Sequence, residues 1–328
     1  MGSRRGESSF RGRVVTPRWP GYHYLVQWDL EPVMECLVCG DERHETFFDQ
    51  DIRKLPLRFV KCRNCSLVFQ SPRLTRECSE RYFDSQIFQK DCESIDFDLK
   101  SPLGYPDYAD WDKSYQETAF LRLKRIRQFR KAPGRLLEIG PATGAFLACA
   151  RNAGYEVSGL DASSSLADVA RKRHDLEIET AFIEESDLPE AFYDIICAFG
   201  GISCWRDPVK ALKKINRALK PDGILTINYP DLNAFVPRVM GKRYFEFNPA
   251  SFTIFSRTTL RRCLEGVGLE PLFSQSERQV ASLGRVFSYL KAEKLERITR
   301  HFKINAFQIP VIVSGTVFEI CGKKSANG

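Results

Sequence analysis

The sequence predicts an α/β fold with a doubly wound sheet, preceded by a small zinc ribbon. Two features predict it: two pairs of closely spaced cysteines near the start, and a strand–turn–helix–strand unit within residues 135–161. The 328 residues suffice for about two domains, and a hydrophobic content of 43% suffices for a sizeable core. The net charge of +7 is compatible with anionic substrates, although nucleic-acid modules usually concentrate their charge more.

Residues 1–33 differ in composition from the rest and are expected to form a disordered basic tail. Arginine is frequent up to Gln27, and Glu7 is the only acid in that stretch of the sequence. A transit peptide is the alternative, because the stretch is rich in arginine and contains serine. Met34, just before the first patterned segment, is an alternative start of the chain. No apolar signal region and no apolar run of about 20 residues is present, so we expect a cytoplasmic protein without a membrane span.

Four cysteines in two pairs predict a structural zinc site. Cys36 and Cys39 form one C-x-x-C knuckle, and Cys62 and Cys65 form another after 22 intervening residues. Two such knuckles can place four thiolates around one zinc ion at about 2.3 Å each, which leaves no open position for a substrate. His44 is an alternative ligand, although four cysteines already complete the shell. With 11 cysteines and no signal peptide, the chain favours thiols or metal ligands over a disulfide framework.

Residues 73–134 are expected to form a helical bridge that also covers part of the main domain. Apolar residues at helical spacing predict a helix from Glu117 to Ala132, and the pair Pro133–Gly134 ends it. The helix carries six Lys and Arg side chains. Such a basic helix either binds nucleic acid or presents one solvated face, and the second is the more common.

The stretch LLEIGPATGAF places an acid and two glycines at the end of a short apolar strand. Gly140 and Gly144 permit a turn that a side chain would block, and the strand after the next helix ends at Asp161. In a doubly wound sheet an acid at that place binds the hydroxyls of a ribose. Glu138, just before the turn, would gain little from the pyrophosphate of a dinucleotide, which is also an anion. It suits instead a cofactor that carries an ammonium group and a sulfonium. S-adenosylmethionine is a cofactor that carries both.

These segments resemble class I S-adenosylmethionine-dependent methyltransferases. LLEIGPATGAF and VSGLDAS resemble the first two motifs of that family, and the segment from Asp187 to Pro230 resembles its later motifs. The cysteine pairs, followed by SLVFQSPRLT and RYF, resemble a subgroup with a zinc-binding domain before the methyltransferase. Members of that subgroup act on sugars, polysaccharide precursors and natural products, which implies a role in biosynthesis. The resemblance covers the chain from Cys36 to Lys323.

The resemblance implies a Rossmann-like domain over 135–323, with seven strands in the order 3-2-1-4-5-7-6. It also implies a zinc ribbon over 34–72 and leaves a short tail over 324–328. Near the end of the chain we expect a helix opened by Ser256, then a strand, a helix and a last strand. Their expected ranges are 255–268, 269–275, 284–302 and 310–324. The two strands are expected to form an antiparallel pair at one edge of the sheet.

The resemblance also assigns a cofactor site, residue by residue. The residues at the methionine end are Glu138, Gly140, Ala142 and Gly144. Those at the ribose and adenine are Asp161, Ala162, Glu184 and Glu185. Tyr105 and Tyr108 fall where related enzymes cover the cofactor with an N-terminal segment. Glu184 is alternatively a solvated loop acid, and the two tyrosines are alternatively ordinary packing aromatics.

The chain departs from its relatives where many of them carry histidine. Ser203–Cys204 replace a Glu–His pair after the fourth strand, and Ser251 stands at a second histidine position. A histidine base is therefore not expected, although an acceptor hydroxyl must still lose its proton. The candidates for a base or an orienting group are Tyr229, Asp231, Tyr244 and Cys204. Residues 241–252 form either an acceptor lid or a packed loop.

The leading functional prediction is a methyltransferase for a small-molecule or glycan acceptor, with O-methylation favoured. An RNA methyltransferase is the second interpretation, in which the zinc ribbon and the basic helix bind phosphates; its binding would weaken steeply with salt. A third interpretation is a non-catalytic protein that binds the cofactor, motivated by the missing Glu–His pair.

Overall fold

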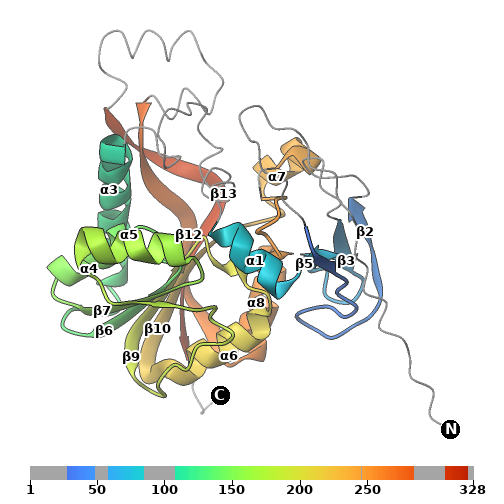
Figure 1. The fold of residues 1–328 in the computed structure, drawn as a ribbon, viewed down its shortest axis with the longest axis horizontal. Coiled ribbons are helices and arrows are strands. Elements are labelled where there is room, and N and C mark those ends of the chain that lie inside the picture. Colours follow the sequence, from blue (N-terminus) through green and yellow to red (C-terminus); the bar gives the residue numbers. More distant parts are fainter. Residues whose placement is uncertain (1–27, 49–57, 85–107, 245, 284–306, 324–328) are drawn as a thin grey trace.

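The computed structural model describes residues 28–48, 58–84, 108–244, 246–283 and 307–323. The tail up to residue 27, the residue Tyr105 and the predicted helix 284–302 lie outside the described residues, as does the short tail after residue 323. Figure 1 shows a large sheet flanked by helices and, beside it, a smaller β-rich lobe that contains the N-terminal strands.

A seven-stranded mixed sheet forms the larger lobe. Its strand order is β12-β13-β10-β9-β6-β7-β8, which confirms the predicted order 3-2-1-4-5-7-6. The neighbours from β10 to β8 are parallel, and β13 runs antiparallel to both β10 and β12, as predicted. The strands, in chain order, are β6 (Arg135–Ile139), β7 (Glu156–Asp161), β8 (Ile178–Thr180), β9 (Tyr193–Phe199), β10 (Leu219–Pro230), β12 (Leu269–Ser282) and β13 (Gln308–Lys323).

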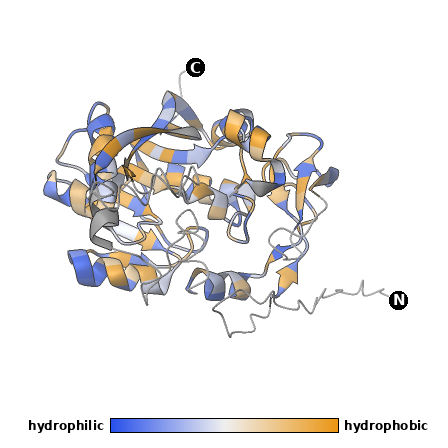
Figure 2. Cartoon of the chain, turned by 90° about the horizontal axis from the view of Figure 1, so that it is seen from above, coloured by the Kyte–Doolittle hydropathy of each residue, from blue (hydrophilic) through white to orange (hydrophobic). Residues whose placement is uncertain are grey.

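Helices cover both faces of this sheet. The helices on one face are α3 (Tyr108–Ile126), α4 (Ala145–Asn152) and α5 (Ser164–His174), and those on the other are α6 (Pro208–Ala218) and α8 (Arg257–Gly266). Figure 2 shows hydrophobic and hydrophilic residues alternating along the helices, as expected when one side of each helix is buried. On β9, Ile195 and Cys197 enter one core while Ile196 and Ala198 enter the other. This period of two is that of a strand buried on both faces.

Side-chain caps explain where the helices behind the sheet begin. The Ser256 side chain accepts from the Thr259 backbone N–H at 3.2 Å, and Thr259 completes a capping box at the start of α8. Asp207 caps α6 by accepting from the Lys210 N–H at 2.8 Å, with Pro208 in the first turn. The predicted helix start at Ser256 is therefore confirmed.

The smaller lobe contains a four-stranded sheet to which the larger lobe contributes. The order is β11-β4-β3-β2, formed by β2 (His44–Phe48), β3 (Phe59–Cys62), β4 (Val68–Gln70) and β11 (Thr253–Ile254). Strand β11 comes from the segment after β10, and its Thr253 pairs antiparallel with Phe69. Of the segment that leads into β11, Tyr244 and Phe247 are buried against Phe59 and Val68, which favours a packed loop between the lobes at these residues.

Two polar contacts reinforce this connection. The Gln70 amide, fully buried, donates to the Asn248 carbonyl at 2.6 Å, and the Gln70 backbone N–H donates to the Phe252 carbonyl at 2.9 Å. On the other side of the lobe, Arg206 donates to the Leu74 carbonyl at 2.8 Å and also pairs with Glu31. Arg206 also donates to the Ser79 hydroxyl at 2.8 Å. These contacts attach α1 (Arg76–Phe83), β1 (Leu30–Glu31) and β5 (Arg73–Leu74) to the loop after β9.

Three short helical segments complete the described fold. They are the 3-10 helices η1 (Ile202–Cys204) and η2 (Gly241–Arg243), and α7 (Phe235–Met240). Among the residues that the structure describes, no helix has both the length and the apolar character needed to cross a membrane.

Candidate cofactor and metal sites

The four predicted zinc ligands converge in the smaller lobe. The sulfur atoms of Cys36, Cys39, Cys62 and Cys65 lie within 4.8 Å of one another. The Cys36 and Cys65 Sγ atoms are 3.4 Å apart, and the Cys39 and Cys62 Sγ atoms are 3.5 Å apart. Four thiolates around one zinc ion stand about 3.8 Å from each other, given bonds of about 2.3 Å. The cluster therefore fits a closed tetrahedral shell without His44.

Tight turns bring each pair of sulfur atoms together. The Gly40 N–H donates to the Cys36 carbonyl at 2.9 Å, and Gly40 has a positive φ of 69°. The Ser66 N–H donates in the same way to the Cys62 carbonyl at 3.0 Å. The ring of His44 packs against Phe69 with centroids 5.9 Å apart, so this side chain has a packing role.

The glycine turn after β6 has left-handed backbone at three positions. The φ angles are 76° at Gly140, 48° at Ala142 and 83° at Gly144. A Cβ added at Gly140 would meet no atom within 4 Å, so this glycine opens onto free space. A Cβ added at Gly144 would lie 2.6 Å from Leu176 Cδ1, so this glycine allows α4 to pack closely. Gly140 is therefore the position where a ligand can approach the backbone.

Asp161 holds that turn in place from the end of β7. Its Oδ2 accepts from the Ala142 N–H at 2.9 Å, and its Oδ1 accepts from the Ser163 N–H at 2.8 Å. Burial raises the pKa of Asp161 to about 6, and these two backbone N–H groups oppose the rise. Each carboxylate oxygen retains a second lone pair, which suits the two hydroxyls of a ribose.

Glu138 presents an unsatisfied acid beside the same turn. Only 3% of this residue is exposed, and among the described residues its Oε2 has no hydrogen-bond partner. Burial raises the pKa of Glu138 to about 8; the charge of Arg122 lowers it and that of Asp161 adds to the rise. A buried carboxyl without a partner is costly. An ammonium group would satisfy it, so the residues present fit the amino-acid end of S-adenosylmethionine.

The acids expected near the adenine have different surroundings. Glu184 is buried, and its Oε1 accepts from the Asp207 N–H at 3.0 Å while its Oε2 lacks a partner among the described residues. This burial does not fit the alternative of a solvated loop acid. Glu185 is exposed and accepts two hydrogen bonds of 2.6 Å from Arg76 on α1. Ala162 packs with Phe182 in an apolar cluster, and Tyr108 is the first residue of α3.

The candidates near the acceptor have structural partners. Tyr229 is 1% exposed, and its hydroxyl donates to Glu319 Oε2 at 2.9 Å. Asp231 Oδ1 accepts from the Asn233 N–H at 3.0 Å and from the Arg257 N–H at 3.2 Å. Tyr244 is buried in the cluster between the lobes. These contacts give the three side chains structural roles in packing and in turn formation.

Cys204, in contrast, is subject to the charges of three carboxyl groups. Burial raises the pKa of its thiol to about 12, and the charges of Glu246, Asp161 and Glu184 contribute to the rise. The thiol therefore stays protonated near neutral pH. Cys204 also packs in one apolar cluster with Ala162, Phe182 and Phe252. The end of β7, the loop after β8, the loop after β9 and the insertion after β10 therefore meet at the carboxyl edge of the sheet, where ligands of such folds bind.

Glu246 is a candidate functional residue that the sequence reasoning missed. Burial raises the pKa of this carboxyl to about 7, and the contact with Ser251 opposes the rise. The Ser251 hydroxyl lies 3.5 Å from Glu246 Oε2. The only signal in the sequence was an isolated acid within the apolar stretch YFEF. A carboxyl with this pKa can act as a base at neutral pH.

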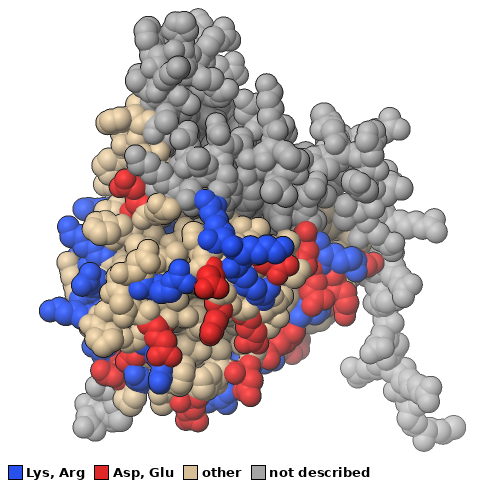
Figure 3. Space-filling view, turned by 60° about the vertical axis from the view of Figure 1, so that its left-hand side comes forward, with Lys and Arg blue, Asp and Glu red and all other residues tan. Residues whose placement is uncertain are grey.

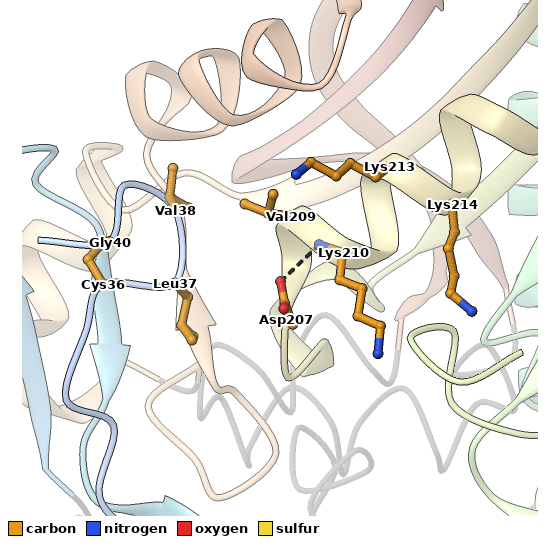
Figure 4. A pocket seen from close by; sticks show the side chains of 9 residues that line it. All are labelled: Cys36, Leu37, Val38, Gly40, Asp207, Val209, Lys210, Lys213 and Lys214. Carbon is orange, nitrogen blue, oxygen red and sulfur yellow. Dashed lines mark hydrogen bonds between the residues drawn. The ribbon is translucent and has the colours of Figure 1, made fainter.

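A separate open cleft of about 420 Å³ lies between the first cysteine knuckle and α6. Figure 4 shows Lys210, Lys213 and Lys214 along α6, opposite Leu37 and Val38 of the knuckle. The lining does not include the glycine turn or the acids described above. This cleft is therefore distinct from the candidate cofactor site.

Comparison with known proteins agrees with this geometry. Residues 111–273 match a family described as a methyltransferase domain. Demethylmenaquinone methyltransferases of Chlorobaculum parvum and Chlorobaculum tepidum are each 28% identical to the chain, over 133 and 156 residues. The matched regions cover 38% and 45% of this chain and 54% and 62% of those proteins. The chain thus spans between about half and two thirds of the length of these relatives.

Solved structures of similar shape include a 1,6-didemethyltoxoflavin-N1-methyltransferase of Burkholderia thailandensis. It is 13% identical, with a TM-score of 0.48, and the match covers 86% of this chain and 100% of that one. The family match and the sheet order lead to one conclusion: the chain contains a class I S-adenosylmethionine-dependent methyltransferase domain.

Proposed function

We propose that this protein transfers the methyl group of S-adenosylmethionine to an oxygen atom of a small-molecule or glycan acceptor. The observation that carries the proposal is the pair of buried acids, Glu138 and Asp161, on either side of the open glycine turn. The Chlorobaculum relatives are named for demethylmenaquinone, which supports a small-molecule acceptor.

In this proposal each acid binds one part of the cofactor. Glu138 accepts hydrogen bonds from the ammonium group, which removes the cost of its unsatisfied Oε2. Asp161 uses its remaining lone pairs for the ribose hydroxyls, while Ala162 and Glu184 lie on the adenine side. When bound, S-adenosylmethionine supplies a methyl group already activated for in-line displacement.

Glu246 serves as the base for the acceptor in this proposal. Its carboxylate takes the proton of the acceptor hydroxyl, and the Ser251 hydroxyl lies 3.5 Å from that carboxyl group. Most of the remaining rate enhancement comes from holding donor and acceptor about 3 Å apart and aligned. We assign this role to Glu246 because Tyr229, Asp231 and Tyr244 are engaged in structural contacts.

The zinc ion, in the same proposal, has a structural role. It would be held by four cysteines, of which Cys62 is the last residue of β3, in the sheet that receives β11. Because β11 follows the insertion that carries Glu246, the ribbon would support the acceptor side of the active site.

Incubation with methyl-labelled S-adenosylmethionine and a fractionated cell extract tests the proposal. We expect the label in small molecules or glycans, released by treatment that cleaves methyl ethers and not by ribonuclease. Cofactor binding without labelling of any fraction would support a non-catalytic protein instead.

RNA methylation is the second candidate, because the lysine-lined cleft lies beside the zinc knuckle. In that case replacement of Lys210 and Lys213 by alanine would weaken RNA binding and reduce its salt dependence. Two observations favour the first candidate. Arg122 and Arg125 of the basic helix are paired with Glu277 and Gln275. On the face seen in Figure 3, basic and acidic side chains of the described residues are intermingled.

A further inference from the structure

The short helix α7 has one packed side and one exposed apolar side. Pro237 is buried, and Val236 packs against the apolar cluster between the lobes. A Cβ added at Gly315 of β13 would lie 3.6 Å from Pro237 Cδ and 3.9 Å from Val236 Cβ, so this side of α7 rests on β13. In contrast, Phe235 is 74% exposed and Val239 is 68% exposed. Since residues four apart share a face of a helix, these two side chains form one apolar surface.

Positive charge borders this apolar surface. Arg238 of α7 and Lys242 of η2 are both exposed, and Met240 between them is 38% exposed. The stretch from residue 231 to residue 246 contains two acids, Asp231 and Glu246, and both are only partly exposed. The exposed part of this stretch therefore combines apolar side chains with positive charge. The α7 patch consists of Phe235, Arg238, Val239, Met240 and Lys242.

The composition of the α7 patch discriminates between possible partners. A second copy of the chain, bound about a two-fold axis, would place the same cations opposite each other, which is unfavourable. Single-stranded nucleic acid is held by stacking of its bases on aromatic side chains, and Phe235 is the only aromatic residue of the patch. Apolar side chains beside Arg and Lys are the combination that binds an anionic lipid surface.

We propose that the α7 patch docks on an anionic lipid surface. Phe235 and Val239 insert among the lipids, and the two cations lie at the negatively charged headgroups. Figure 1 shows α7 above β2 and β3, at the upper end of the smaller lobe. The insertion after β10 carries both α7 and Glu246, so docking would hold the acceptor side of the candidate site close to the lipid surface. Lipid docking goes beyond the proposed function and does not depend on the identity of the acceptor.

Co-sedimentation of the full, zinc-loaded chain with lipid vesicles tests this role. One set of vesicles contains phosphatidylcholine alone, and the other also contains phosphatidylglycerol, which is anionic. A first variant combines Phe235→Ser with Val239→Ser and removes the apolar contact. A second variant combines Arg238→Gln with Lys242→Gln and removes the positive charge. All four side chains are exposed, so the unfolding temperature of each variant should equal that of the wild type.

Two control variants change similar residues elsewhere on the surface. Phe120→Ser removes an apolar side chain of α3 that is 60% exposed. Lys210→Gln combined with Lys213→Gln removes two exposed charges of α6, the same change in net charge as in the second patch variant. Both controls should bind the vesicles like the wild type.

We expect the wild type to bind the anionic vesicles, to bind phosphatidylcholine alone much more weakly, and to lose affinity as salt rises. The charge variant should bind about 10- to 30-fold more weakly, and the apolar variant about 10- to 100-fold more weakly. No binding by the wild type, equal binding to both kinds of vesicle, or an unchanged affinity in either patch variant would overturn the proposal.

Two further results would also contradict lipid docking. An equal loss of affinity in the lysine control would show that net charge alone explains the binding. A dimer in light scattering that the apolar variant dissociates, together with no vesicle binding, would assign the α7 patch to a second copy of the chain.

Discussion

The backbone N–H of Ala142 donates to Asp161 Oδ2 over 2.9 Å, so the acid to which we assign ribose binding also shapes the turn. Ala142 is not a glycine, yet it has a positive φ of 48°. Left-handed backbone costs a non-glycine residue about 1–2 kcal/mol. The hydrogen bond to Asp161 offsets part of that cost. The end of β7 thereby fixes the loop that follows β6.

The two outer glycines of the turn should respond differently to alanine. Gly144→Ala should lower the free energy of unfolding by about 2–4 kcal/mol, because a positive φ adds to a contact of 2.6 Å with Leu176. Gly140→Ala has a positive φ but no neighbour within 4 Å, so it should lose about 1–2 kcal/mol.

The two variants should rank in the opposite order when cofactor binding is measured instead of stability. Since a Cβ at Gly140 would enter the free space in which we propose that the cofactor approaches the backbone, Gly140→Ala should weaken S-adenosylhomocysteine binding more than Gly144→Ala does. Urea unfolding and calorimetry on both variants check the two halves of this prediction. Equal stability losses would contradict the packing role given to Gly144.

Glu138→Gln should change how stability depends on pH. Burial raises the folded-state pKa of Glu138 from about 4.5 to about 8, so between these values the folded protein holds a proton that the unfolded chain releases. The contribution of Glu138 to stability is therefore present at low pH and is lost as pH rises through this window. The loss approaches about 1.4 kcal/mol per pH unit.

Urea unfolding of the wild type and Glu138→Gln from pH 5 to pH 8 measures this difference. The variant should gain stability relative to the wild type as pH rises, and should lose affinity for S-adenosylhomocysteine at every pH. Parallel stability curves would show that Glu138 does not hold a proton in the folded, unliganded protein.

Glu246→Gln should slow methyl transfer about 100-fold or more at saturating substrate, with little change in KM for the cofactor. The wild-type rate should rise with pH through about 7, because Glu246 must be ionised to accept a proton, and it should then level off. Glu265→Gln, on the exposed side of α8, is the matched control. A Glu246→Gln enzyme with an unchanged rate and pH profile would exclude this residue as the base.

Cys65→Ser should remove bound zinc and destabilise the larger lobe as well as the ribbon. The reason is that β11, Tyr244 and Phe247 pack on the sheet that the zinc ion would hold. Metal analysis should find about one zinc per wild-type chain and much less in the variant. As a control, the Cys149→Ser variant should keep the bound zinc ion, because Cys149 lies outside the cluster. If Cys65→Ser unfolds at the same temperature as the wild type, the lobes are not coupled in this way.

The central sheet could be predicted because its signals are local. The apolar strand before Gly140, the acid at Asp161 and the cap at Ser256 each depend on neighbouring residues. The cysteine cluster could be predicted as well, since the spacing of the four cysteines alone implies it. The order of the outer strands came from the resemblance, because no local pattern determines which strands become neighbours.

What the sequence did not reveal depends on contacts between distant segments. Strand β11 has two residues, and it exists because Thr253 pairs with Phe69 from the other lobe. Glu246 has an altered pKa only because the insertion around it is buried against that lobe. Strand β12 continues to Ser282, beyond the predicted end at Gln275, because β13 offers a long antiparallel partner.

Binding of S-adenosylhomocysteine to the full, zinc-loaded chain tests the central claim most directly. Calorimetric titration of the wild type should show one site per chain. Asp161→Ala should weaken binding at least 10-fold, because it removes both the proposed ribose contact and the anchor of the turn. Asp168→Ala, in an exposed ion pair on α5, should bind like the wild type. No binding by the wild type, or equal binding by Asp161→Ala, would contradict the account.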